Sequence, residues 1–137
     1  MRPRRLRVLA LAALLGAVAT SPGRAGPLDE AGALVLQQIE ALRKHDFATA
    51  YGFSSRELRR NFSRGEFEWM LKRAHPEVAD STFASVVRTH ESEGYVYVTV
   101  KIRGRNGESV EALYEMVHEA DGWRVNALTS RVDDGLL

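Results

Sequence analysis

The sequence YVYVTVKI, residues 95–102, places a valine or isoleucine at every second position, the pattern of a β-strand with one buried face. Asn106-Gly107 follows it, then a strand-like run over residues 109–118, then Asp121-Gly122 and a last run over residues 123–128. Asn-Gly and Asp-Gly supply the positive φ angles that tight hairpin turns require. The last third of the chain is therefore predicted to form an antiparallel meander.

The half of the chain before this meander has helical patterning. Apolar residues recur at steps of three and four over residues 28–42, which predicts an amphipathic helix of about four turns. Asp46 is placed to cap a short second helix through residues 47–51. Ser54-x-x-Glu57 and Ser63-x-x-Glu66 are capping boxes, and they predict two more helices.

The last of these helices should end at Pro76, followed by a loop over residues 77–81 and a first strand over residues 82–89. Helices followed by antiparallel strands make an α+β fold, with the N-terminal helices packed on a curved antiparallel sheet of about four strands. One domain over residues 28–132 is expected, with a tail over residues 133–137.

The alternation assigns the strand side chains that should face the helices. Val98 and Val100 are expected to pack on Ile39 and Leu42 of the first helix, with Trp123 also inside. The predicted inner set is Val96, Val98, Val100, Ile102, Val110, Ala112, Tyr114, Met116, Trp123, Val125 and Ala127.

The first 19 residues have the layout of a secretory signal peptide. Four arginines precede an apolar run over residues 8–18, and Ala17-Val18-Ala19 offers small residues at the cleavage positions. The run is about half of the ~20 residues that a membrane span requires, so we expect cleavage near Ala19 and no stable span afterwards. Cleavage after Ala25 and a retained anchor are the alternatives. Residues 20–27 are interpreted as a linker, and the mature chain as periplasmic or secreted.

Charge and composition narrow the classes of partner. The leader holds four of the 19 basic residues and none of the 18 acidic ones, so residues 20–137 carry 15 basic and 18 acidic residues, a net charge of −3. Proteins that bind nucleic acid usually have a basic excess, so no nucleic-acid partner is predicted. The chain has no cysteine, which leaves a packed core to stabilise a single domain.

Short motifs, taken in order, resemble a known family. The segment HDFATAY, residues 45–51, is similar to the early helices of nuclear-transport-factor-2-like (cystatin-like cone) domains. Tyr114-Glu115-Met116 and the segment DGWRV, residues 121–125, are similar to their last two strands. The chain as a whole resembles an uncharacterised bacterial family of exported domains with this fold, in which we expect an aromatic residue at the position of His75.

The resemblance implies a conical domain with a pocket between the concave face of the sheet and the helices. Some members of the superfamily are isomerases or dehydratases, in which a buried acid projects into the cone, and others bind ligands without catalysis. Candidate residues for lining such a pocket, each with a plainer structural interpretation as core or cap, are Tyr51, Trp69, Tyr114, Trp123 and Asp46.

The predicted inner faces contain no carboxylate, and no histidine before His118 near a strand end. No catalytic residue is therefore assigned. The four histidines lack metal-ligand spacing, so no metal site and no cofactor are predicted.

The sequence is consistent with three candidate functions. The first is an exported cell-envelope module that binds a small apolar ligand, or acts as an accessory domain, without catalysis. The second is a small isomerase or dehydratase that uses the cone pocket, and the third is a structural protein that dimerises. A homodimer through the open sheet face is expected, because Tyr95, Tyr97, Thr99, Leu113, Val117 and Leu128 are predicted to share that face.

Overall fold

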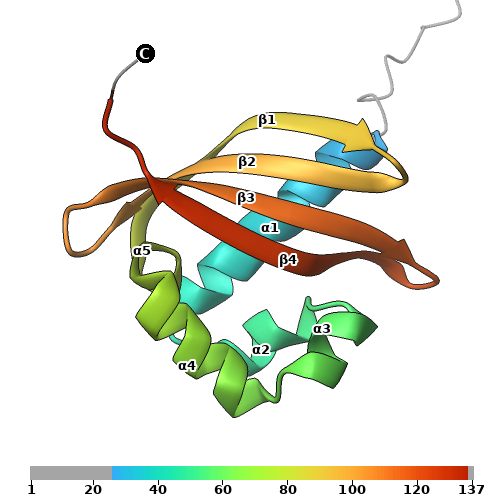
Figure 1. Ribbon diagram of the computed structural model, residues 1–137, viewed down its shortest axis with the longest axis horizontal. Coiled ribbons are helices and arrows are strands. Elements are labelled where there is room, and N and C mark those ends of the chain that lie inside the picture. The colour runs from blue at the N-terminus through green and yellow to red at the C-terminus, as the bar shows by residue number, and fades with distance from the viewer. Residues whose placement is uncertain (1–25, 136–137) are drawn as a thin grey trace, which may run out of the picture.

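The computed structural model describes residues 26–135, and within them helices precede strands. The elements are α1 (Pro27–Arg43), α2 (Phe47–Gly52), α3 (Arg56–Asn61), α4 (Arg64–Ala74), α5 (Pro76–Ala79), β1 (Ser81–Ser92), β2 (Tyr95–Gly104), β3 (Ser109–Glu119) and β4 (Gly122–Val132). This order confirms the predicted α+β fold (Figure 1). The predicted signal peptide lies outside the described residues, and Pro27, assigned to the linker, is the first residue of α1.

The four strands form one antiparallel sheet in the order β1-β2-β3-β4. Gly107 and Gly122 have φ angles of 85° and 120°, at the two turns that the sequence predicts. A third turn joins β1 to β2 through Glu93 and Gly94, whose φ angles of 51° and 82° are those of a type I′ hairpin. Three short turns therefore make the sheet a continuous meander.

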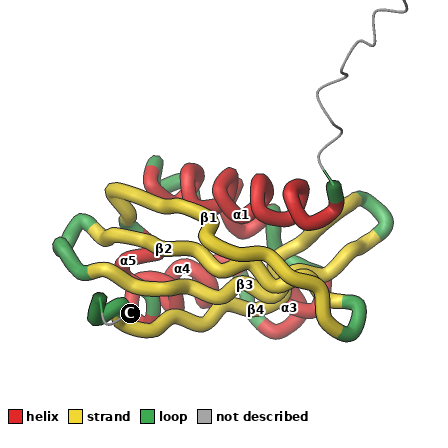
Figure 2. The backbone as a smooth tube through the Cα atoms, turned by 90° about the horizontal axis from the view of Figure 1, so that it is seen from above, coloured by secondary structure: helices red, strands yellow, loops and turns green. Residues whose placement is uncertain are grey.

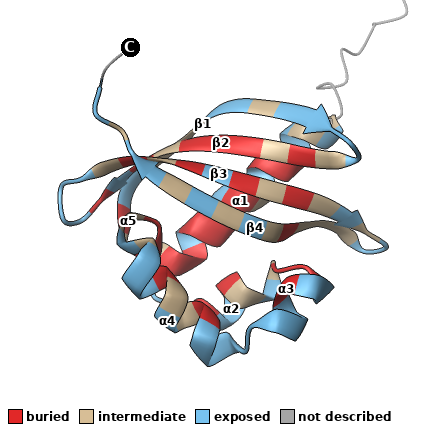
Figure 3. Ribbon diagram, viewed as in Figure 1, coloured by how far each residue is buried: buried red, intermediate tan, exposed pale blue. Residues whose placement is uncertain are grey.

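The helices cover one face of the sheet. Figure 2 shows α1 alongside β1 and the shorter helices behind the strands, while the other face of the sheet is turned toward the viewer. The predicted inner side chains of β2 and β3 are all buried, and so are Ile39 and Leu42 of α1 (Figure 3). The core thus lies between α1, the inner face of the sheet and the short helices. No helix within residues 26–135 is long and apolar enough to cross a membrane.

The capping residues of α2 and α4 are those that the sequence predicted, whereas the capping residue of α3 is not. Asp46 caps α2 and Ser63 caps α4, each accepting a hydrogen bond from the backbone three residues on. The cap of α3 is Ser55, and not Ser54 as the capping box predicted. Ser54 is held in an extended bridge to Val125 of β4, so the helix can begin only after it.

The segment after α4 also differs from the expectation. Pro76 was predicted to be followed by a loop, but it is the first residue of α5. Proline suits this position because the first helical N–H needs no partner. The His75 N–H bonds to the Leu71 carbonyl at the end of α4, and the His75 carbonyl accepts from the Ala79 N–H of α5. One residue therefore ends one helix and begins the next.

A β-bulge makes the predicted phase of β4 wrong in its second half. Met116 pairs with Val125, but Glu115 pairs with Ala127, so Asn126 is an extra residue in β4. Beyond it the alternation reverses: Leu128, predicted to lie on the open face, packs against the core, and Ala127, predicted to be inside, is exposed. Trp123, before the bulge, is half-buried at the end of the sheet instead of fully inside.

Candidate functional site

An apolar cavity opens between β4 and the helices. It has a volume of about 210 Å³ and is lined by Gln38, Leu58, Phe62, Phe67, Met70, Leu71, Val125, Asn126, Ala127 and Leu128. These residues come from α1, α3, α4, β4 and the segment between α3 and α4. None of the described residues that line the cavity is ionisable. Its chemistry is therefore that of an apolar binding pocket with two amide side chains in its wall.

Gln38 is the buried polar residue of this wall. It is 2% exposed, and its Nε2 donates to the Ala50 carbonyl at 3.1 Å, which ties α1 to α2. Within the described residues the Gln38 carbonyl oxygen takes no hydrogen bond, so it can accept one from a ligand. The sequence held a signal for this residue, because Gln38 interrupts the apolar stripe of Val35, Ile39 and Leu42.

Asn126, the second amide, is fixed in place by the bulge and its neighbours. Its Oδ1 accepts from the Ser55 hydroxyl at 2.7 Å, and its Nδ2 donates to Glu115 Oε2 at 2.9 Å. The other Glu115 oxygen accepts from the Tyr97 hydroxyl at 3.2 Å. These bonds use both ends of the Asn126 amide, so Asn126 shapes the cavity wall and offers little to a ligand. Nothing in the sequence distinguished Asn126 from its neighbours.

Tyr51, a predicted pocket residue, supports the wall from outside the cavity. Its hydroxyl donates to the Phe62 carbonyl at 2.6 Å, and its ring lies 5.4 Å from the ring of Phe67. Phe62 and Phe67 both line the cavity. Tyr51 therefore holds the backbone of Phe62 and packs on the ring of Phe67 without lining the cavity itself.

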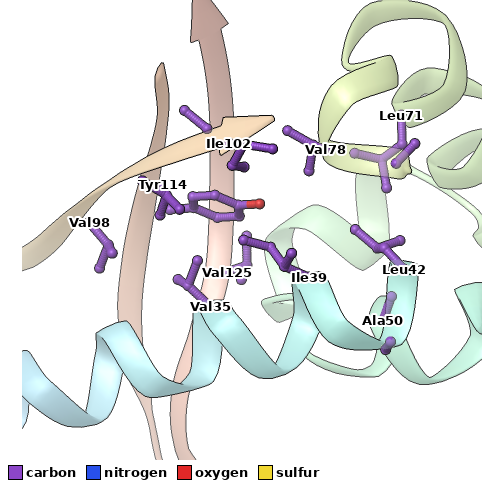
Figure 4. Close-up of a cluster of buried hydrophobic side chains, with 14 of the residues drawn as sticks. Val35, Ile39, Leu42, Ala50, Leu71, Val78, Val98, Ile102, Tyr114 and Val125 are labelled. Atoms are coloured by element: carbon purple, nitrogen blue, oxygen red, sulfur yellow. The ribbon is translucent and has the colours of Figure 1, made fainter. Parts of the chain in front are cut away.

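Tyr114, the second predicted pocket residue, lies in the core one strand away from the cavity. It pairs with Leu128, which lines the cavity, and it is fully buried. Figure 4 shows its ring among Ile102, Val125 and Ile39, with the hydroxyl oxygen in these apolar surroundings. Within residues 26–135 that hydroxyl has no hydrogen-bond partner, and burial raises the pKa of Tyr114 far above its usual value.

The other predicted pocket residues lie away from the cavity. Trp69 is 63% exposed, with the Arg73 guanidinium over its ring, and it does not line this cavity. Trp123 packs edge-on against His118. Asp46 caps α2 by accepting from the Thr49 hydroxyl at 2.6 Å and the Thr49 N–H at 3.1 Å, and these bonds lower its pKa. Asp46 is thus fully engaged as a helix cap.

His75 stands where the resemblance led us to expect an aromatic residue. Its Nδ1 is 2.7 Å from the Ser130 hydroxyl, which the bulge has turned to the inner side of β4. Burial of the half-buried imidazole lowers the pKa of His75, while Glu77 acts in the opposite direction. Within the described residues neither side chain has a carboxylate partner, so the pair lacks the third group that orients a catalytic histidine. It joins the α4–α5 junction to β4.

Residues 29–135 match a family described as "Domain of unknown function (DUF4864)". The chain belongs to this family. The matched segment spans all nine elements of the DUF4864 domain except the first two residues of α1. No curated protein matches the chain.

Two solved structures have the same fold as this DUF4864 domain. One is an NTF-2-like protein of unknown function from Silicibacter pomeroyi DSS-3, with 16% sequence identity and a TM-score of 0.53, covering 74% of this chain and 91% of the other. The second is an NTF2-like protein of unknown function from Shewanella baltica OS155, with 15% identity and a TM-score of 0.53, covering 75% and 91%. The predicted nuclear-transport-factor-2-like fold is confirmed, and so is the resemblance to an uncharacterised family that has it.

Proposed function

We propose that this DUF4864 domain is an exported binding module that holds a small, mainly apolar ligand in the cavity between β4 and the helices, without catalysis. The observation that carries the proposal is the composition of the cavity wall. Seven aliphatic, aromatic or thioether side chains line it, together with Ala127 and two amides. Pockets built this way bind apolar molecules and use a few polar groups to orient them.

The volume sets the size of the ligand. The cavity measures about 210 Å³, and an apolar cavity of about 150 Å³ is already large enough for benzene. A single aromatic ring with one small substituent is therefore a suitable occupant. Because the Gln38 carbonyl is free to accept a hydrogen bond, a ligand with one O–H or N–H donor should bind more tightly than its hydrocarbon analogue.

The test is an NMR titration of the protein with phenol and with toluene, following the methyl signals of Leu71 and Leu128, which line the cavity in the parent and in both variants. Met70→Trp fills the cavity with a larger side chain, while Met70→Leu keeps its volume and is the matched control. We expect saturable shifts with both probes, tighter binding of phenol, loss of binding in Met70→Trp and retention in Met70→Leu. Shifts that do not saturate, or that persist unchanged in Met70→Trp, would refute the proposal.

The absence of catalysis is part of the proposal, and it is supported by the lack of an ionisable group in the described cavity wall. The alternative is an isomerase or dehydratase, which requires an acid or base at the bound substrate. Asp46 is the acid that the family resemblance singled out, and both of its interactions with Thr49 serve the helix cap. Clear turnover that Asp46→Asn abolishes in a folded protein would establish the enzymatic alternative.

We also propose that two copies associate through the open sheet face. Leu113, 38% exposed on β3, and the partly exposed Tyr95, Tyr97 and Val117 support this. The charges on the same face are largely paired, as in Arg131 with Glu111 at 2.8 Å, so the contact would be modest and partly polar.

A further inference from the structure

A second hollow of the molecule lies beside α5, between the α1–α2 turn and the β2–β3 turn. It has a volume of about 300 Å³ and is lined by His45, Phe47, Lys72, Pro76, Ala79, Asp80, Arg105 and Asn106. The α1–α2 turn, α2, α4, α5 and the β2–β3 turn each contribute to it. We call it the basic groove, because a lysine, an arginine and a histidine from three separate segments surround it.

The backbone of His45 has a left-handed conformation at the end of α1. The His45 N–H bonds to the Leu42 carbonyl and the Asp46 N–H to the Ala41 carbonyl, the two bonds of a Schellman motif at the end of α1. The left-handed position of this motif is usually a glycine, but here it is His45, with a φ of 58°. The motif places the exposed His45 among the residues that line the groove.

The Arg105 guanidinium is bonded through its Nε atom only, within residues 26–135. Its Nε is 3.2 Å from both carboxylate oxygens of Asp80, and its backbone N–H also bonds to the Asp80 carbonyl. Within residues 26–135 its two terminal nitrogens make no hydrogen bond. They form the flat pair of donors that binds a carboxylate through both of its oxygens.

The rest of the groove supplies an apolar floor and a second cation. The floor consists of Phe47, Pro76 and Ala79, and the Lys72 ammonium lies 5.0 Å above the Phe47 ring. Glu68 pairs with Lys72 at 2.8 Å, but that pair is exposed and gains little energy, so Lys72 remains able to turn toward an anion.

The β2–β3 turn is packed closely enough to keep the groove formed. A Cβ atom at Gly104 would lie 2.6 Å from Asn106 Oδ1 and 3.0 Å from the Glu77 backbone, so only glycine allows this approach of β2 to α5. Asn106 Nδ2 donates to Glu77 Oε1 at 3.3 Å across the same contact. Arg105 is thereby held beside α5 whether or not a ligand is bound.

We propose that the basic groove binds a small organic carboxylate with an apolar body. The carboxylate binds to the terminal nitrogens of Arg105 and to Lys72, His45 contacts its edge, and the apolar body lies on Phe47, Pro76 and Ala79. This site is separate from the cavity beside β4 and does not depend on a ligand there. The Asp80 carboxylate on the Arg105 Nε lies beside the donors for the ligand and repels its carboxylate, so removal of the Asp80 charge should strengthen binding.

The test is a titration of the full chain with benzoate, followed by NMR on the His45 ring protons and the Arg105 Nε–H signal. Benzyl alcohol tests the need for charge, and inorganic phosphate tests the need for an apolar body. We expect saturable binding of benzoate with a Kd on the order of 1 mM, a value set by the exposure of the charges. Both control compounds should bind at least several-fold more weakly.

Variants separate a binding site from a merely structural cluster. Arg105→Gln should weaken benzoate binding about tenfold or more, while Asp80→Asn should strengthen it, because a negative charge beside the guanidinium is then removed. His45→Gly should weaken binding while the protein stays folded. Arg60→Gln, which removes the same charge from an exposed position of α3, should change nothing.

The outcomes that overturn the proposal are equally specific. It fails if benzoate gives no saturable shift, if Arg105→Gln binds as tightly as the parent, or if Asp80→Asn weakens binding. Met70→Trp should leave benzoate binding intact; if it abolishes the binding, benzoate occupies the other cavity, and the groove is not a site.

Discussion

Replacing Tyr114 by phenylalanine should make the protein more stable. Tyr114 is fully buried and its hydroxyl has no partner within residues 26–135. Burying a hydroxyl without a hydrogen bond costs about 1–3 kcal/mol in mutational series. Removing the oxygen also loses a few dispersion contacts, each about 0.1–0.2 kcal/mol. We therefore expect Tyr114→Phe to raise the free energy of unfolding by about 1 kcal/mol.

The same atom can be removed from Tyr51 as a matched control. The Tyr51 hydroxyl donates to the Phe62 carbonyl at 2.6 Å, so Tyr51→Phe loses a hydrogen bond and leaves a carbonyl to be satisfied by water. Such a bond contributes about 1 kcal/mol. The two variants differ from the parent by one oxygen each, and the structure predicts opposite signs for them.

Urea unfolding followed by tryptophan fluorescence measures both changes, and thermal unfolding checks them. For a domain of about 110 residues, 1 kcal/mol corresponds to about 4 °C in Tm. Tyr114→Phe should therefore melt about 4 °C above the parent and Tyr51→Phe about 4 °C below it. A Tyr114→Phe protein that is less stable than the parent by as much as Tyr51→Phe would show that the buried hydroxyl is hydrogen-bonded, and would refute the reasoning.

The remaining predictions concern pH, association and processing. Because burial lowers the pKa of His75, the unfolded chain takes up this proton at a higher pH than the folded one, so stability should fall as the pH drops below about 6.5. Urea unfolding at several pH values should show part of this loss removed in His75→Gln; an identical pH profile for both proteins would contradict it. Light scattering over a concentration series should show dimers that Leu113→Lys converts to monomers, whereas a monomer mass at high concentration in the parent would exclude the sheet-face contact. When the chain is produced with its leader in a bacterial host, N-terminal sequencing should find a protein that begins at Thr20, and an intact Met1 would show that the leader is retained.

The order and type of the elements could be predicted because each has a local signal. The inner positions of β2 and β3 are buried along both strands, so counting by two placed Tyr114 and its neighbours correctly on the inner face. Thr99, predicted on the open face, is an exception to the alternation, because it is only 2% exposed. The turn residues Gly107 and Gly122 marked where the chain reverses. In α4, Phe67, Met70 and Leu71 recur at steps of three and four, the spacing of one helix face, and all three line the cavity.

The site was predicted less well, because it depends on contacts between distant segments. Trp69 was proposed for its residue type, although it lies off the apolar stripe of α4 and is exposed. Gln38 was overlooked as a polar side chain on an otherwise apolar helix face. Ser55 replaces Ser54 as a helix cap because Ser54 bridges to Val125, about 70 residues away, and no local pattern contains that pairing.

The extra residue in β4, Asn126, changes which side chains of the strand face the helices. Up to Val125 the odd-numbered side chains of β4 face the helices, and after Asn126 the even-numbered ones do. Regular pairing of the same residues, with Asn126 opposite Glu115, would move Leu128 and Ser130 to the opposite side of the sheet, away from the cavity and from His75. Deleting Asn126 would instead keep both side chains on the inner side, because their partners on β3 would not change. In comparisons among DUF4864 sequences, a sequence that lacks the bulge should therefore be one residue shorter in β4, with its gap at Asn126. Whether Asn126 is bulged or paired thus decides which side chains in the second half of β4 face the helices.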